Sequence, residues 1–198
     1  MPKIVDHGER RTELAEAVCR VIARDGVQEV SVRTVAAEAG WSTGTLRYYF
    51  TSRAELLASA CALVIERVSA RIGELRQTGD IRWTVRAALL ETMPLDERRR
   101  TEETVAFSFL ALGLGDPALA AVQRTHFEAM YRLCRSLIDA LGDLNLLADN
   151  AIPREAAARR LHAVVDGLAL QGLARHLDPK EMTAQLDSYL NDLIVPEN

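Results

Sequence analysis

Apolar residues recur every three to four positions along most of this chain, which is the spacing of one face of an α-helix. The clearest stretch covers residues 53–76, and its apolar stripe consists of Leu56, Leu57, Ala60, Val64, Val68, Ile72 and Leu75. No segment of the sequence alternates apolar and polar residues convincingly, as a half-buried strand does. The sequence therefore predicts an all-α fold of about nine helices.

Capping residues mark where these helices begin and end. Gly26 and Gly40 follow the first two helices, at the position that favours a left-handed residue. Ser52 and Glu55 have the spacing of a capping box at the start of the long helix at residues 53–76. Further helices are expected over residues 81–92, 96–114, 117–141, 153–177 and from 179 onward.

Composition excludes several classes of protein. The chain has 198 residues, 48% of them hydrophobic, so it can bury a core, and its net charge of -4 excludes a polycation that coats nucleic acid. Its three cysteines are far apart and odd in number, which disfavours a disulfide framework and fits a reducing cytosol. Because neither a signal-peptide core nor an apolar run of membrane-spanning length occurs, we expect a soluble cytoplasmic protein without a membrane partner.

One short segment, AGWSTGTLRYYF at residues 39–50, offers hydroxyls, aromatic rings and an arginine on a helix of about two turns. With Ser42 as its N-cap, Trp41 and Leu46 occupy the positions of a hydrophobic staple. Leu46, Tyr49 and Phe50 are then spaced so that at least part of each faces inward. The residues expected to face mostly outward are Thr43, Gly44, Arg47 and Tyr48, with Thr45 at the edge. The preceding helix, a turn with glycine and this segment together predict a helix-turn-helix.

The outward residues of this segment suit the major groove of DNA. The hydroxyls of Thr43 and Thr45 can bond phosphates or base edges, and Arg47 can bond a guanine at two atoms. Gly44 lowers helix stability by about 1 kcal/mol relative to alanine, but its bare backbone lets another surface approach closely. We therefore expect double-stranded DNA to be the partner of this segment.

The run SVRTVAAEAGWSTGTLRYYFTSRAELL, residues 31–57, follows a helix that ends in RDG and resembles the DNA-binding unit of the TetR family of bacterial transcriptional regulators. The resemblance implies DNA binding by a dimer, and a helical remainder that binds a ligand and holds the dimer together. Carried onto matching positions, it implies DNA contacts from Arg33, Thr43, Gly44, Thr45, Arg47, Tyr48, Tyr49 and Arg53. The position of Arg53 usually holds a phosphate-binding lysine, whereas Arg47 stands where tyrosine is frequent, so no operator sequence is carried over.

Two segments of the remainder, GDPALAAV at residues 115–122 and VVDGLALQGL at residues 164–173, resemble the C-terminal domain of the choline-responsive repressors. Gly167 and Gly172 lie inside a helix, where glycine is costly, so close packing against another helix is expected. We predict that the last two helices form a four-helix, two-fold interface in a homodimer. The domains are predicted to be residues 1–52, which bind DNA, and residues 53–198, which bind an effector and dimerise.

Large side chains and a few polar groups in the middle helices predict a site for an unknown small-molecule effector. The candidate residues are Trp83, Phe107, Phe109, Phe127, Met130, Tyr131, Cys134, Asp166 and Gln171. The charged run ERRRTEE at residues 97–103 is expected to be a solvated helix start. No catalytic constellation, cofactor motif or metal-ligand spacing is present in the sequence, so we expect neither an enzyme nor a cofactor.

These patterns predict a repressor that binds a pseudo-palindromic operator as a dimer and is released by a small molecule. The long helix at residues 53–76 would transmit the signal. One alternative is a DNA-binding protein of the same fold that is controlled by a protein partner or is architectural; a cavity above about 300 Å³ would favour ligand control instead. Another alternative, an enzyme or carrier with a vestigial N-terminal unit, would bury Arg33, Thr43 and Arg47.

Overall fold

The computed structural model describes residues 7–75, 80–113, 115–148 and 152–196. Within these ranges the only strand-like pairing is a single antiparallel bridge between Leu147 and Ile194, and the all-α prediction is confirmed. The α-helices are α1 (His7–Asp25), α2 (Val32–Ala39), α3 (Thr43–Tyr49), α4 (Arg53–Leu75), α5 (Ile81–Leu90), α6 (Glu97–Phe107), α7 (Phe109–Gly113), α8 (Pro117–Asp143), α9 (Arg154–Leu173) and α10 (Pro179–Leu193), and one 3-10 turn, η1, covers Val27–Glu29.

The helices begin and end at the predicted capping residues, but one capping hydrogen bond comes from a different donor than expected. Gly26 and Gly40 have φ values of 89° and 72°, the left-handed conformation that only glycine adopts without strain. At the start of α4, the Ser52 hydroxyl accepts a hydrogen bond from the Glu55 N–H at 3.2 Å, as a capping box requires. The Glu55 carboxylate, however, accepts from the Thr51 N–H at 2.7 Å, one residue earlier than the expected return bond. The cap therefore also holds Thr51, which follows Phe50 at the end of α3.

Two of the predicted helices are shorter in the structure. The helix expected over residues 96–114 is interrupted at Ser108, whose hydroxyl donates to the Thr104 carbonyl, and becomes α6 and α7. Such back-bonding by serine competes with the backbone ladder and bends a helix. The helix expected to reach residue 177 ends at Leu173, and Arg175 adopts a left-handed conformation with φ 58°.

The chain divides into two compact units, which differ from the predicted domains. Unit 1 comprises residues 1–67 and 104–126, and unit 2 comprises residues 68–103 and 127–198. Three helices, α4, α6 and α8, contribute residues to both units. The boundary at residue 52 stays a prediction, because it follows the DNA-binding function rather than compactness.

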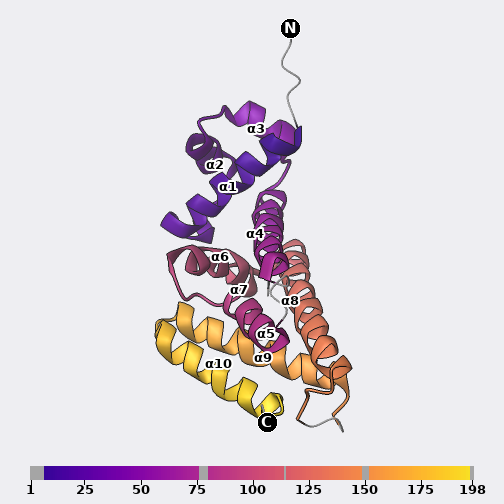
Figure 1. Ribbon diagram of the computed structural model, residues 1–198. Coiled ribbons are helices and arrows are strands. Elements are labelled where there is room, and N and C mark those ends of the chain that lie inside the picture. Colours follow the sequence, from indigo (N-terminus) through magenta and orange to yellow (C-terminus); the bar gives the residue numbers. More distant parts are fainter. Residues whose placement is uncertain (1–6, 76–79, 114, 149–151, 197–198) are drawn as a thin grey trace. The chain divides into compact units, whose positions relative to one another are not determined.

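In unit 1, α1 packs against α2, and α2 against α3, at the N-terminal end of the chain (Figure 1). Their shared core is apolar and fully or nearly fully buried: it contains Leu14, Val18, Val21, Ile22, Val30, Val35, Leu46 and Phe50. Burying such side chains contributes about 1.5–3 kcal/mol each, so the orientation of α3 is fixed by Leu46 of the helix itself and by Phe50 directly after it.

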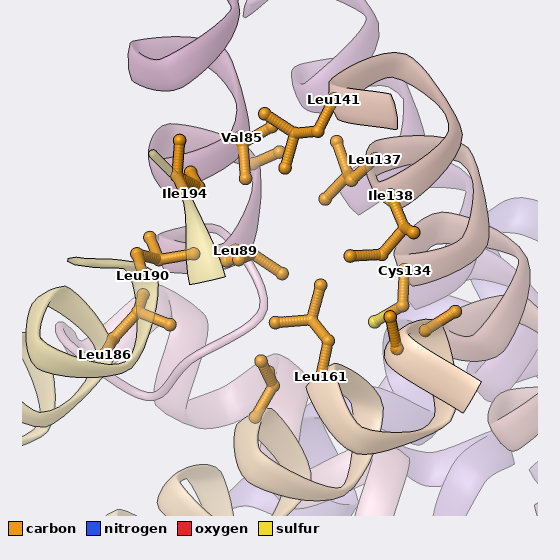
Figure 2. Packing of buried hydrophobic residues seen from close by; sticks show 14 of the residues in the cluster. Val85, Leu89, Cys134, Leu137, Ile138, Leu141, Leu161, Leu186, Leu190 and Ile194 are labelled. Atoms are coloured by element: carbon orange, nitrogen blue, oxygen red, sulfur yellow. The ribbon is translucent and has the colours of Figure 1, made fainter. Parts of the chain in front are cut away.

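In unit 2, α9 and α10 lie side by side and share a core with α5 and α8 (Figure 1). Figure 2 shows Leu89, Ile138, Leu161 and Leu190 converging from these helices. Gly172 belongs to this interior, since a Cβ at that position would overlap the Met182 sulfur and approach the Pro94 ring. Gly167 has no atom within 4 Å of the corresponding position. Close packing inside the subunit thus accounts for Gly172, whereas a side chain at position 167 would enter open space.

Candidate functional site

The polar edge of α3 faces solvent. Thr43, Gly44, Thr45 and Arg47 are exposed, and Tyr48 has an exposed fraction of 73%. The remaining predicted contact residues are the exposed Arg33 on α2, the half-buried Tyr49 at the end of α3 and the half-buried Arg53 at the start of α4. An edge of hydroxyls and a guanidinium over a fixed apolar back can enter a groove without deforming the unit that carries it. The burial of Arg33, Thr43 and Arg47 that a vestigial N-terminal unit would favour is not observed, since all three are exposed.

The start of α3 is held by the residues expected there, although Trp41 acts differently from a simple staple. The Ser42 hydroxyl accepts the Thr45 N–H at 3.0 Å, which confirms Ser42 as the N-cap. The Trp41 indole donates to the Glu13 carboxylate on α1 at 3.2 Å and meets the Tyr49 ring edge-on, with 5.7 Å between centroids. Trp41 therefore ties the turn before α3 to α1 and braces the far end of α3.

Arginines on α1 fix the other helix ends of this region. Arg11 donates to the Tyr49 carbonyl at 3.0 Å, at the C-terminus of α3, and its guanidinium lies 4.6 Å from the centre of the Phe50 ring. Arg20 and Arg24 both bond the Glu38 carboxylate on α2 at 2.7 Å. These contacts hold α2 and α3 on α1, so the spacing of their exposed residues is preset.

Arg53 has an intramolecular role that the sequence did not indicate. Its Nε–H donates to the Val30 carbonyl at 2.8 Å, and its Nη2 donates to the Val27 carbonyl at 2.7 Å. These carbonyls belong to η1 and to the residue directly before Ser31, the N-cap of α2. The first turn of α4 is thereby bonded to the entry of the helix-turn-helix. The guanidinium has further N–H groups that could donate to a phosphate, so the predicted DNA contact is compatible with this role.

Gly44 has no packing reason to be glycine. A Cβ at this position would meet only the Ser42 hydroxyl, at 3.8 Å, which is an ordinary contact. The backbone conformation is that of a regular helix, so alanine would be more stable there. Packing within the described part of the subunit therefore does not account for a glycine at the exposed start of α3.

The candidate effector residues are divided between the two units. In unit 1, Phe107 and Phe109 are buried, and Phe107 meets the His126 ring at 5.5 Å. In unit 2, Met130 and Cys134 are buried. Trp83 is 44% exposed, at an open groove beside the end of α10.

Tyr131 and Gln171 are two further candidates in unit 2. Each contacts another group of that unit, which leaves it poorly placed to contact a ligand. Gln171 is exposed and donates to the Gly167 carbonyl of its own helix. The ring of Tyr131 is covered by the Arg159 guanidinium, 4.8 Å from its centre.

Asp166 on α9 lies close to another side chain of unit 2. One of its carboxylate oxygens lies 3.0 Å from Nε2 of His162, and the His162 ring meets Phe127 at 6.0 Å between centroids. Burial, and secondarily the charge of Asp166, raises the pKa of the Cys134 thiol to about 12. Burial and then the charges of Asp166 and Glu102 raise the pKa of the Glu103 carboxyl well above its usual range. Asp166 and Phe127 thus both lie against His162, a residue that sequence reasoning missed.

The charged run at residues 97–103 starts a helix as expected, with Glu97 and Arg98 exposed, but its end is not solvated. Glu102 and Glu103 are buried, with exposed fractions of 8% and 5%. Glu102 receives two bonds from Arg71 of α4, at 3.0 and 2.6 Å, and Arg100 donates to the Gly172 carbonyl at the end of α9 at 3.1 Å. The overlooked signal was that Glu103 precedes Ala106 and Phe107 by one helical turn, on the same buried face.

Two surface grooves mark unit 2. One of about 450 Å³ runs along α9 and α10, and its wall is mainly apolar: Leu147, Ile152, Ala157, Arg160, Ala163, Val164, Tyr189, Asp192 and Leu193. The other, of about 690 Å³, lies between α5 and the end of α10 and includes Trp83. No helix in the described ranges has the length and apolarity to cross a membrane, and no group of metal-ligating side chains gathers there.

Comparison with known proteins decides the family. A family model for the BetI-type transcriptional repressor, C-terminal domain, matches residues 81–195, and the model of bacterial regulatory proteins, tetR family, matches residues 14–60. The chain belongs to the TetR family. It is 39% identical over 184 residues to the HTH-type transcriptional regulator PksA of Bacillus subtilis, covering 90% of this chain and 84% of that protein.

Two further relatives extend the comparison. The HTH-type nicotine-responsive transcriptional repressor HdnoR of Paenarthrobacter nicotinovorans is 28% identical over 190 residues, covering 92% of this chain and 95% of its own. A transcriptional regulator of Saccharomonospora viridis, solved in complex with choline, superposes with a TM-score of 0.81 at 24% identity, covering 96% of this chain and all of that one, and supports the fold. This TetR-family protein is a DNA-binding transcriptional regulator with a BetI-type repressor domain, and its family consists of regulators rather than enzymes.

Proposed function

We propose that this TetR-family regulator reads its operator through the exposed edge of α3. Thr43, Thr45 and Arg47 would contact base edges and nearby phosphates, and Arg33 on α2 would meet the neighbouring bases. The observation that carries this assignment is the pairing of a solvent-exposed polar edge with the fully buried Leu46 and Phe50 behind it. Gly44 supports it, because a bare backbone at this exposed position would let DNA approach closely and no packing contact requires the missing side chain.

The dimer would form through the α9 and α10 groove. Its wall is mainly apolar and its rim carries Arg160 and Asp192, so a second copy could bury the apolar part and pair the charges. Gly167 on α9, with open space above it, would let the partner helix approach. Two α3 helices would then meet successive major grooves, about 34–36 Å apart.

An effector would control this dimer through α4. The helix begins with Arg53, bonded to the helix-turn-helix, and ends in unit 2 beside the Arg71–Glu102 ion pair. A small molecule that binds unit 2 and prefers one position of α4 would release the operator. A 100-fold preference corresponds to about 2.7 kcal/mol of coupling. The nicotine-responsive relative supports control by a small molecule.

Selection of bound sequences from a random DNA pool tests the DNA-binding proposal. We expect two inverted half-sites whose centres lie about 10 base pairs apart or a multiple of that distance. Arg47→Ala should then lose affinity for the selected sequence but not for random DNA. A single, unpaired half-site in the selected pool would overturn the dimeric reading.

Sedimentation velocity tests the interface with matched variants. Ala163→Arg places a bulky charge in the groove of α9 and α10 and should produce monomers, since the residue is exposed and lines that groove. Ala70→Arg makes the same change at an exposed position of α4 outside it and should leave the dimer intact. Dimers of equal affinity in both variants would move the interface elsewhere.

A further inference from the structure

Gln123 on α8 is a buried polar residue of unit 1, and only 5% of its surface is exposed. Among the residues that the structure describes, neither its nitrogen Nε2 nor its oxygen Oε1 has a hydrogen-bond partner. A buried amide that makes no hydrogen bond destabilises a fold, and few native side chains are left in this state. Gln123 therefore offers two N–H donors and a carbonyl acceptor to a molecule from outside the chain.

The Gln123 side chain points toward α7 and the end of α6. There the Phe107 ring meets the His126 ring of α8 with 5.5 Å between centroids. Gly113 at the end of α7 lies against the first turn of α8, since a Cβ on it would lie 3.0 Å from the Ala120 Cα. Gln123 lies about one helical turn after Ala120 and one before His126, so its direction falls between theirs, about 60° from each. The segment that contacts both neighbours therefore covers the amide.

The interior of unit 1 around this amide is mainly apolar. Phe107, Phe109 and Leu119 are buried in the same unit. In the described part of unit 1, Gln123 and His126 are the only buried polar residues, and no buried aspartate, glutamate, lysine or arginine occurs there. A charged group would lose its hydration without a carboxylate, ammonium or guanidinium to offset the loss. The group that pairs with Gln123 should therefore be neutral.

The geometry of an amide group selects its complement. The Gln123 amide presents a donor and an acceptor side by side in one plane. A ligand meets both at once only if its own acceptor and donor also lie side by side. Primary amides and lactams have this arrangement, because an N–H and the C=O lie on the same side of the amide bond. An open-chain secondary amide is trans, so it can pair with only one of the two Gln123 atoms.

We propose that unit 1 holds a ligand site in which Gln123 pairs with a primary amide or a lactam through two hydrogen bonds. Its Nε2–H donates to the ligand carbonyl, and its Oε1 accepts from the ligand N–H. The buried Phe107 supplies apolar surface for the carbon skeleton of the ligand. The site is additional to the effector response proposed for unit 2 and does not depend on it, because both residues belong to unit 1.

Calorimetric titration of the purified full-length protein, without DNA, tests the site. The probes are 2-pyridone, a lactam, and benzamide, a primary amide. Their controls, N-methyl-2-pyridone and N,N-dimethylbenzamide, keep the ring and the carbonyl but have no N–H. We expect both probes to bind, with dissociation constants of about 0.1–1 mM for molecules this small, and both controls to bind at least about tenfold more weakly. Controls that bind as tightly as the probes, or no binding of either probe at about 10 mM, overturn the proposal.

Two matched variants separate a binding role of Gln123 from a structural one. Gln123→Leu should weaken binding of both probes by at least about tenfold without lowering the melting temperature, because it removes a buried amide that makes no hydrogen bond. Gln28→Leu makes the same change at an exposed position of unit 1 and should leave probe affinity unchanged. Unchanged probe affinity in Gln123→Leu contradicts the site. A lower melting temperature in that variant would show that the amide is already satisfied, and it too would overturn the proposal.

Discussion

Replacing Arg53 separates two roles of one side chain. The family resemblance predicts that Arg53 holds a DNA phosphate, whereas the structure bonds its guanidinium to the carbonyls of Val27 and Val30 at 2.7 and 2.8 Å. A hydrogen bond from a charged group contributes about 1.5–3 kcal/mol, and the half-buried position favours the lower end. Losing both bonds in Arg53→Ala should therefore cost about 3 kcal/mol of unfolding free energy. For a chain of this length that corresponds to a fall of about 6–12 °C in melting temperature.

Arg53→Lys is the decisive variant because it keeps the charge and removes the planar fork. A lysine ammonium can bond one of the two carbonyls, so we expect about half of the loss in stability. Thermal unfolding without DNA measures this effect alone. The salt dependence of operator binding measures the other role, since each lost phosphate contact reduces the slope by about 0.9.

The outcomes are clearly separated. If Arg53 is an intramolecular brace, Arg53→Ala and Arg53→Lys both melt early. If it is only a phosphate contact, both variants melt within about 1 °C of the wild type, Arg53→Ala has a lower salt slope, and Arg53→Lys binds DNA normally. That second pattern would refute the bracing role. Arg47→Ala is the control, because Arg47 is exposed on α3 and its loss should leave the melting temperature unchanged.

Four further predictions concern exposed or tightly packed positions. Arg47→Ala should weaken binding to the selected operator by about 1–3 kcal/mol, measured by anisotropy; equal loss on random DNA would make it a phosphate contact. Gly44→Ala should stabilise the subunit by up to about 1 kcal/mol, measured as a higher melting temperature, and should weaken operator binding. Gly172→Ala should destabilise the subunit by about 1–3 kcal/mol in chemical denaturation. Gly167→Ala should instead weaken the dimer in sedimentation; an unaffected dimer would place Gly167 outside the interface.

The helix-turn-helix could be predicted because its signals are local. Ser31, Gly40 and Ser42 cap helices within one turn of themselves, and the inward spacing of Leu46 and Phe50 follows from helix geometry alone. The contacts of Arg53 could not be predicted, because its acceptors are backbone carbonyls more than twenty residues earlier. A carbonyl has no sequence signature, since every residue carries one.

The burial at the end of the charged run could not be predicted for a related reason. The composition of residues 97–103 favours solvent, yet Glu102 is buried against Arg71 of α4, and the half-buried Arg100 donates to a carbonyl of α9. Those partners are separated from α6 by 31 and 72 positions in the chain. Charge pairing over such distances is set by the tertiary fold, so single-sequence reasoning assigned the run to solvent and missed Glu103.

Gly44 breaks a local rule of helix propensity, because glycine lowers the stability of a helix relative to alanine. No packing contact in the described subunit requires the missing side chain, since a Cβ at this position would meet only the Ser42 hydroxyl at an ordinary distance. Positions that break a local rule without internal compensation are expected at functional sites. An exposed glycine at the start of α3 admits a large, close surface, and a DNA backbone is such a surface.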